Sequence, residues 1–125
     1  MISANALNVL IVEDDPELRA LYRAMLQMEG FAVVGVEDGI DALRHIEVDP
    51  PDAVVLDLGL PRLGGRDVQR EIAARMEMRG IPIVIVTGEP IDDLDPKDFA
   101  CILRKPLDPQ SLVTAVHDCL RKAPT

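Results

Sequence analysis

Short, uninterrupted apolar runs recur along the chain, and segments with helical periodicity separate them. A short run without polar alternation is typical of a strand that is buried on both faces of a sheet. Parallel strands cannot be joined by a tight turn, so each pair needs a crossover, usually a helix. The alternation therefore predicts an α/β fold: a doubly wound, five-stranded parallel sheet with helices on both faces. The predicted strands are residues 9–12, 31–36, 53–56, 81–86 and 100–103.

Two of the intervening segments begin with the same helix-start signal. Asp15 precedes Pro16, and Asp108 precedes Pro109. In each pair the aspartate can cap the first turn, and the proline suits the first helical position. Gly30 is the predicted stop of the first of these helices. Apolar residues at helical spacing predict the side of that helix that packs on the sheet, namely Leu18, Leu21, Met25 and Leu26.

The length of 125 residues suits a single domain, expected over residues 1–125 with its core at about residues 8–120. Acidic residues outnumber basic ones by 22 to 13, so we expect no binding of nucleic acid by this domain. No apolar run approaches the roughly 20 residues of a membrane span, so no membrane contact is expected. Cys101 and Cys119 lack metal-site spacing and are expected to be reduced core residues of a cytoplasmic protein.

Polar residues follow the predicted strands at the point where each strand ends. Glu13 and Asp14 follow the first strand, and Asp57 follows the third. Thr87 follows the fourth strand and Lys105 lies beside the end of the fifth. Because ligand sites of doubly wound sheets lie beyond the carboxyl ends of the strands, these side chains are expected to form one site.

The acids in this set predict a metal site. A phosphate-binding turn after the first strand would offer glycines and free N–H groups, whereas carboxylates there would repel an anion. Clustered carboxylates favour a hard divalent cation such as Mg²⁺. We expect Asp14 and Asp57 to be direct ligands and Glu13 to reach the metal through water. The backbone carbonyl of Gly59 could complete the protein's share.

With a metal beside it, one carboxylate can act as a nucleophile toward phosphorus and form an aspartyl phosphate. Burying Asp57 between an apolar strand and Leu58 without a partner would be costly, so an exposed functional role is expected for this acid. A transferring phosphoryl group needs positive partners and hydrogen-bond donors. The Lys105 ammonium and the Thr87 hydroxyl would supply them.

Taken together, these motifs resemble the receiver domain of two-component response regulators, the chemotaxis-regulator-like fold. The resemblance implies the strand order 2-1-3-4-5 and a phosphoacceptor role for Asp57. It also implies an acidic pocket at Glu13 and Asp14, a switch hydroxyl at Thr87 and a phosphate-sensing lysine at Lys105. The segments that carry it are residues 9–15, 55–61 with Gly65, 84–88 and 105–106.

Partners follow from the same resemblance. Receiver domains accept a phosphoryl group from a histidine kinase or a histidine phosphotransfer protein, and they signal to a downstream protein target through protein–protein contacts. They are not otherwise enzymes, although they catalyse their own phosphorylation and dephosphorylation. The implied cofactor is Mg²⁺.

Two departures from the family pattern concern the region before Lys105. Ile102 stands where the family usually has an aromatic switch residue, and it is expected to stay packed. The connection between the fourth and fifth strands is short and contains Pro90 and Pro96. Since Pro96 disfavours a helical residue before it, we expect the fourth helix of the family to be short or disordered here. A receiver subgroup with a weak or missing fourth helix shows the same pattern.

Two alternatives to a stand-alone receiver remain. The chain could be a receiver module from a larger regulator or hybrid kinase, for which the start at Met1 and the end soon after the last predicted helix argue only slightly against. It could also be an aspartate-nucleophile phosphatase. That class needs a second aspartate two residues after the nucleophile, and Gly59 at this position disfavours it.

Overall fold

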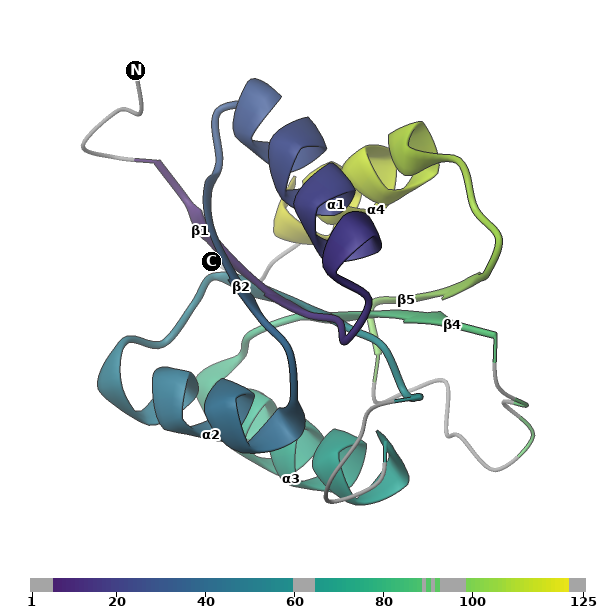
Figure 1. The fold of residues 1–125 in the computed structure, drawn as a ribbon. Coiled ribbons are helices and arrows are strands. Elements are labelled where there is room, and N and C mark those ends of the chain that lie inside the picture. Colours follow the sequence, from purple (N-terminus) through teal and green to yellow (C-terminus); the bar gives the residue numbers. More distant parts are fainter. Residues whose placement is uncertain (1–5, 60–64, 89, 91, 93–98, 122–125) are drawn as a thin grey trace.

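The computed structural model describes residues 6–59, 65–88, 90, 92 and 99–121. Figure 1 shows a central sheet with helices α1 and α4 on one face and α2 and α3 on the other. The strands are β1 (Asn8–Val12), β2 (Ala32–Val36), β3 (Ala53–Leu56), β4 (Ile83–Thr87) and β5 (Cys101–Arg104). The helices are α1 (Pro16–Met28), α2 (Gly39–Val48), α3 (Gly65–Arg79) and α4 (Pro109–Arg121).

All five strands run parallel in the order β2-β1-β3-β4-β5, which confirms the predicted fold and strand order. The register pairs Val12 of β1 with Leu56 of β3, so the residues that follow these two emerge at the same height. Beyond the strand bounds, the Asp57 N–H donates to the Val12 carbonyl at 3.0 Å. The parallel pairing of β1 and β3 therefore fixes the positions of Glu13 and Asp57, the acids that follow these strands.

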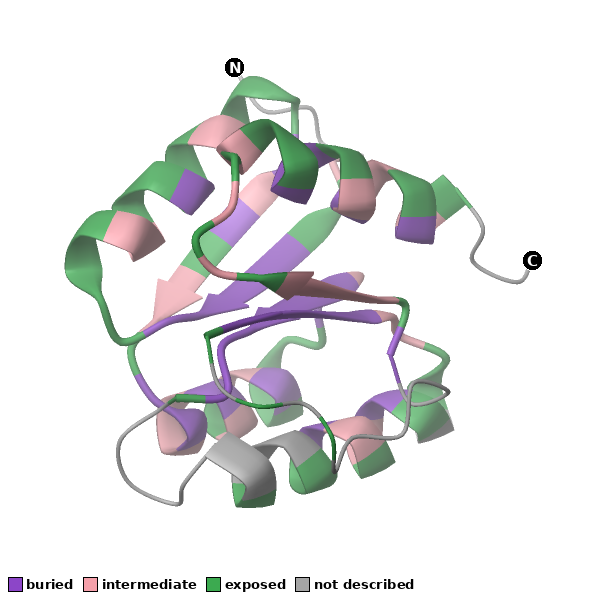
Figure 2. Cartoon of the chain, turned by 90° about the vertical axis from the view of Figure 1, so that its right-hand side faces the viewer, coloured by how far each residue is buried: buried purple, intermediate pink, exposed green. Residues whose placement is uncertain are grey.

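The sheet separates two hydrophobic clusters. Alternate residues of a strand point to opposite faces, so Ile11 packs with α1 and α4 while Leu10 packs with α2 and α3. The strands are consequently buried on both sides, as the purple ribbons between the helix layers show in Figure 2. This double burial explains why the sequence of the inner strands lacks polar alternation.

Helix starts agree with the predicted capping signals. The Asp15 carboxylate accepts hydrogen bonds from the N–H groups of Glu17 and Leu18, at 2.9 and 3.3 Å. Asp108 likewise accepts from the N–H of Gln110 at 3.1 Å. At the other end of α1, Gly30 has a φ of 93°, which a residue with a side chain rarely adopts.

The predicted inner side of α1 was wrong at one position. Leu21 is 42% exposed, whereas the neighbouring Tyr22 is buried and belongs to the α1/α4 cluster. The helix turns Tyr22 onto the same stripe as Leu18, Met25 and Leu26, at the spacing i, i+4, i+7 and i+8. The tyrosine ring supplies more apolar area to that stripe than the leucine would.

The sequence predicted that the helix between the fourth and fifth strands would be short or disordered. That segment falls largely on residues outside the described part of the chain. Each of the four helices that the structure describes lies elsewhere, and residue 92 is in a turn. On β5, Ile102 is half-buried and packs against the cluster under α2 and α3.

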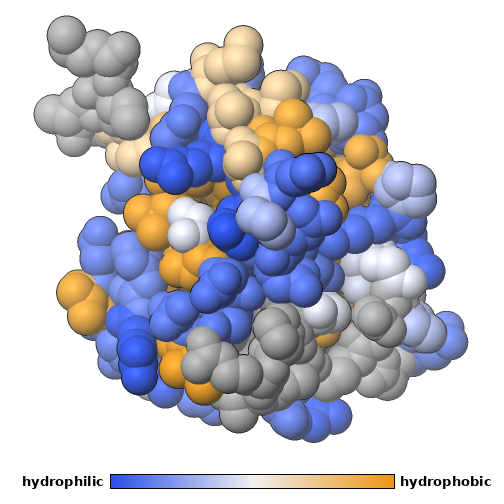
Figure 3. Space-filling view, viewed as in Figure 1, coloured by the Kyte–Doolittle hydropathy of each residue, from blue (hydrophilic) through white to orange (hydrophobic). Residues whose placement is uncertain are grey.

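Hydrophilic residues are interspersed with apolar ones on the molecular face in Figure 3. Among the described residues, the large apolar side chains that are exposed are scattered along the chain: Leu7, Leu21, Met28, Val34 and Val48. Among the described residues, no helix combines the length and apolar character that crossing a membrane requires.

The two cysteines differ in environment, so the expectation that both are core residues holds fully for Cys119 and only in part for Cys101, which packs against the same cluster. Cys119 on α4 is buried, while Cys101 at the start of β5 is only half-buried. Burial raises the pKa of the Cys119 thiol to about 11, and the nearby Cys101 adds to the effect. Since the thiolate is the reactive form, burial makes Cys119 chemically inert at neutral pH.

We therefore expect Cys101 to be alkylated by iodoacetamide at pH 8 at least about tenfold faster than Cys119 in the folded protein. A pKa near 11 leaves only about one Cys119 thiol in a thousand ionised at this pH. Peptide mass spectrometry over a labelling time course measures both rates. The urea-unfolded protein is the control, in which the two rates converge; equal rates in the folded protein would contradict the assigned burial.

Candidate functional site

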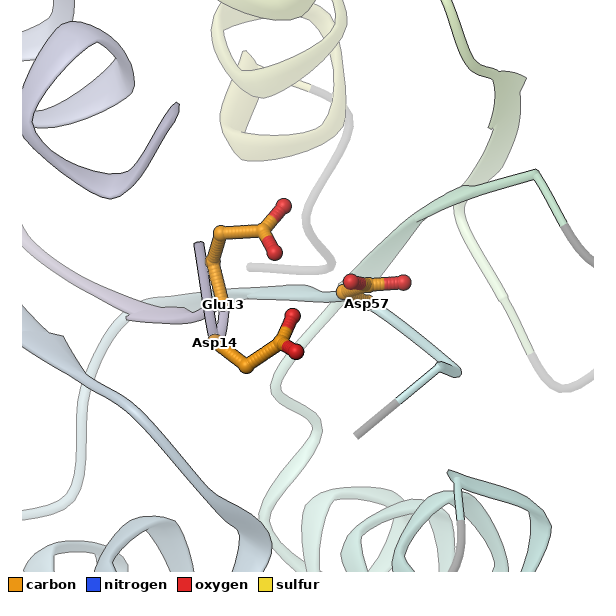
Figure 4. Close-up of side chains that lie close together, drawn as sticks. All are labelled: Glu13, Asp14 and Asp57. Carbon is orange, nitrogen blue, oxygen red and sulfur yellow. The ribbon is translucent and has the colours of Figure 1, made fainter. Parts of the chain in front are cut away.

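Three carboxylates meet at the carboxyl edge of the sheet. Glu13 and Asp14 follow β1, and Asp57 follows β3 (Figure 4). One oxygen from each lies within 4.8 Å of the other two. Glu13 and Asp57 are buried, with 1% and 6% exposure, whereas Asp14 is exposed. The expectation that Asp57 is exposed was therefore wrong, because a lysine partner makes its burial possible. The inner part of the cluster is thus buried, while Asp14 places its outer part in contact with solvent.

Lys105 bridges the two buried acids. Its Nζ donates to Oε1 of Glu13 at 2.7 Å and to Oδ2 of Asp57 at 3.0 Å. The backbone N–H of Lys105 donates to the Thr87 carbonyl at 2.9 Å, which ties the residue after β5 to the end of β4. The ammonium supplies the partner without which two buried carboxylates would be strongly destabilising.

Backbone N–H groups hold the second oxygens of the buried acids. Gly59 donates to Oδ1 of Asp57 at 3.0 Å, and Asp15 donates to Oε2 of Glu13 at 3.2 Å. Asp14 differs, because its carboxylate forms no hydrogen bond with the part of the chain that the structure describes. Its position therefore depends on the backbone that carries it.

The electrostatics of the cluster reflect an excess of acid. The pKa of Glu13 rises from its ordinary 4.5 to about 7, mainly because the carboxyl is buried. The hydrogen bond from Lys105 opposes this rise, and the neighbouring Asp57 carboxylate adds to it. Burial lowers the pKa of Lys105, but its bonds to Glu13 and Asp57 outweigh burial and raise it overall. The lysine stays charged, yet one ammonium does not neutralise three acids.

The structure brings together most of the residues that the sequence singled out. Glu13, Asp14, Asp57 and Lys105 form one cluster, and Thr87 lies fully buried at the end of β4, beside the Lys105 backbone. For Gly59 the structure gives the N–H bond to Asp57, while the carbonyl as a metal ligand stays a prediction.

Sequence reasoning missed one residue beside the site. Arg19 of α1 donates from Nη1 to the backbone carbonyl of Glu13 at 2.8 Å. No local motif links these two residues, which lie on successive elements. The glycine at position 35 of the adjacent strand could have been a signal, because the Arg19 side chain passes directly over it.

A parallel sheet in the order 2-1-3-4-5, with acids at the ends of β1 and β3 and a lysine after β5, defines a chemotaxis-regulator-like signalling domain. The comparison with protein families agrees. The response regulator receiver domain model matches residues 9–117, and the chain belongs to this family.

Known proteins show the same likeness. BvgA of Bordetella pertussis is 41% identical over 85 residues, covering 66% of this chain and 39% of that protein. The transcriptional regulatory protein BaeR of Escherichia coli is 34% identical over 97% of this chain and 51% of its own. The chain thus spans about half or less of the length of these relatives. A CheY-like receiver domain from Methylobacillus flagellatus superimposes with a TM-score of 0.78 at 30% identity, covering 92% of this chain and 99% of that one.

The acid excess generates a prediction about stability. In the presence of a chelator, Asp57→Asn should raise the free energy of unfolding by about 1 kcal/mol, because it removes one of two buried carboxylates that share a single lysine. Urea denaturation followed by circular dichroism measures the change.

Asp118→Asn is the matched control, since it removes an exposed acid from α4 and should change stability by less than about 0.5 kcal/mol. If the Asp57→Asn protein is instead less stable than the unmodified protein, the Lys105–Asp57 ion pair stabilises the fold by more than the repulsion between Asp57 and Glu13 destabilises it. The idea that the site carries an unfavourable excess of acid is then wrong.

Proposed function

We propose that this domain accepts a phosphoryl group on Asp57 from a phosphohistidine of a histidine kinase or phosphotransfer protein, in a reaction that requires Mg²⁺. The observation that carries the proposal is the pairing of the Asp57 carboxylate with the Lys105 ammonium at 3.0 Å, beside two further acids. Membership of the receiver family supports the same reaction.

The donor set suits Mg²⁺. Three carboxylates with oxygens within 4.8 Å of one another are hard ligands, and the exposed Asp14 leaves room for the waters that Mg²⁺ keeps. In the proposed site Asp14 and Asp57 bind the ion directly, Glu13 acts through water, and the Gly59 carbonyl contributes. When bound, the ion offsets the negative charge of the phosphoryl oxygens.

The chain's own residues then have distinct tasks. An Asp57 oxygen forms the new P–O bond as the P–N bond of the phosphohistidine breaks, and the electron pair of that bond stays on the donor's imidazole. The Gly59 N–H at 3.0 Å from Oδ1 holds the carboxylate in place. Lys105 and the Thr87 hydroxyl are proposed to bind phosphoryl oxygens.

The proposal extends to the fate of the signal. Attack of water on phosphorus releases phosphate and regenerates the Asp57 carboxylate, so the domain catalyses its own dephosphorylation without acting on other substrates. We propose that output passes through protein–protein contacts and that this domain itself does not bind nucleic acid, given its net charge of -9. DNA binding by a longer relative, such as the DNA-binding response regulator MtrA of Mycolicibacterium smegmatis, would then reside outside the segment that matches this chain.

We expect Asp57→Asn to abolish phosphorylation, because the amide nitrogen and oxygen cannot replace the carboxylate nucleophile. The phosphorylated histidine kinase and a small acyl phosphate serve as donors, and intact mass spectrometry detects the adduct. Asp118→Asn, an exposed acid on α4, should behave as the unmodified protein does. An adduct that forms on the Asp57→Asn protein at an undiminished rate would falsify the assignment.

Removing the metal should stop the reaction. We expect excess chelator to abolish phosphorylation, and Asp14→Asn to raise the Mg²⁺ concentration for half-maximal rate at least about tenfold, because a direct ligand is lost. Rates measured across a Mg²⁺ titration test both statements. Undiminished phosphoryl transfer in chelator would rule out the metal role of the acidic cluster.

A further inference from the structure

Arg19 crosses from α1 to the strand on the edge of the sheet. Its aliphatic stem lies against Gly35 of β2, where a Cβ atom would stand 2.9 Å from Cγ and 3.1 Å from Cδ of the arginine. Such distances are too short for any residue with a side chain unless Arg19 moves. Arg19 can therefore follow this path only because residue 35 is a glycine and has no Cβ atom.

The end of that path is the backbone of the acidic loop. Arg19 Nη1 donates to the Glu13 carbonyl at 2.8 Å, and this carbonyl belongs to the peptide group whose N–H is that of Asp14. On its other side Glu13 is fixed by its own N–H, which donates to the Val36 carbonyl at 3.1 Å. Arg19 thus fixes the orientation of the peptide plane from which Asp14 projects.

Asp14 depends on this restraint more than the other acids do. Glu13 and Asp57 are held through their carboxylates by Lys105 and by backbone N–H groups. The Asp14 carboxylate forms no hydrogen bond with the described residues, so only its backbone determines where it points.

We propose that Arg19 is a positioning residue that aims the Asp14 carboxylate at the metal, with Gly35 as the gap that lets it reach the Glu13 carbonyl. The proposal rests on the proposed function, because it assumes that Asp14 binds Mg²⁺. In this role Arg19 acts through the Glu13 carbonyl and is not itself a metal ligand.

The direction in which Mg²⁺ affinity changes when Arg19 is lost distinguishes a positioning role from a purely electrostatic one. A guanidinium near a cation site repels the cation, so on electrostatics alone the loss of Arg19 would strengthen Mg²⁺ binding. Positioning predicts the opposite, since an unrestrained Asp14 must be ordered when the metal binds. Loss of a group that orients a metal ligand typically weakens binding about 10- to 100-fold.

The test titrates each protein with Mg²⁺ alone and follows backbone amide chemical shifts. We expect Arg19→Met, which keeps an unbranched stem without the donors, to weaken Mg²⁺ binding about tenfold. Arg19→Lys, which restores charge and one donor, should recover part of the loss. Arg23→Met is the matched control: it removes an exposed arginine one turn along α1 and should leave Mg²⁺ affinity unchanged or slightly higher.

A double-mutant cycle tests the role of the glycine. Gly35→Ala should weaken Mg²⁺ binding several-fold because its Cβ displaces the arginine stem. In an Arg19→Ala background, where the atoms that would clash are gone, Gly35→Ala should have no further effect on Mg²⁺ affinity. Additive effects would overturn the role assigned to Gly35.

Phosphorylation rates give a second readout. At saturating Mg²⁺ the Arg19→Met protein should reach the unmodified maximal rate, whereas at low Mg²⁺ it should be slower. Equal Mg²⁺ affinity of Arg19→Met and Arg23→Met, or tighter binding by Arg19→Met, overturns this inference and leaves phosphorylation of Asp57 intact. Absence of Mg²⁺ binding by the unmodified protein overturns the proposed function and this inference together.

Discussion

A carboxylate removed from water must be paired, and the carboxyl edge of this sheet is organised around that constraint. Lys105 directly follows the last strand, and its ammonium contacts both buried acids. One ammonium therefore links the ends of the first, third and fifth strands. The pairing is incomplete, since one lysine serves the two buried carboxylates and a third acid, Asp14, lies beside them. An excess of clustered carboxylates is also the kind of ligand set that a hard divalent cation prefers.

Much of this arrangement could be predicted from the sequence because it depends on strand order and strand ends. Uninterrupted apolar runs indicate strands buried on both faces, and crossover helices force them to be parallel. Once strands are parallel, every residue that follows a strand lies at the same edge. Glu13, Asp57 and Lys105 could therefore be assigned to one site although the chain separates them widely.

What could not be predicted depends on how elements pack in three dimensions. The burial of Tyr22 in place of Leu21 follows from the rotation of α1 on the sheet, which periodicity leaves uncertain by one residue. The bond from Arg19 to the Glu13 carbonyl needs the helix, the loop and the second strand in their final places. Cys101 is less buried than Cys119 because it lies on an edge strand, which has a neighbouring strand on one side only.

The parallel register between β1 and β3 limits how this chain can evolve. Val12 pairs with Leu56, and one inserted or deleted residue in either strand would shift the following acid by about 3.3 Å and exchange the two faces of that strand. Both hydrophobic clusters would then receive the wrong side chains. Changes of length should accumulate instead in the connections at the opposite edge of the sheet, such as the one before Ala53. An insertion there would enlarge the domain without changing the spacing of its acids.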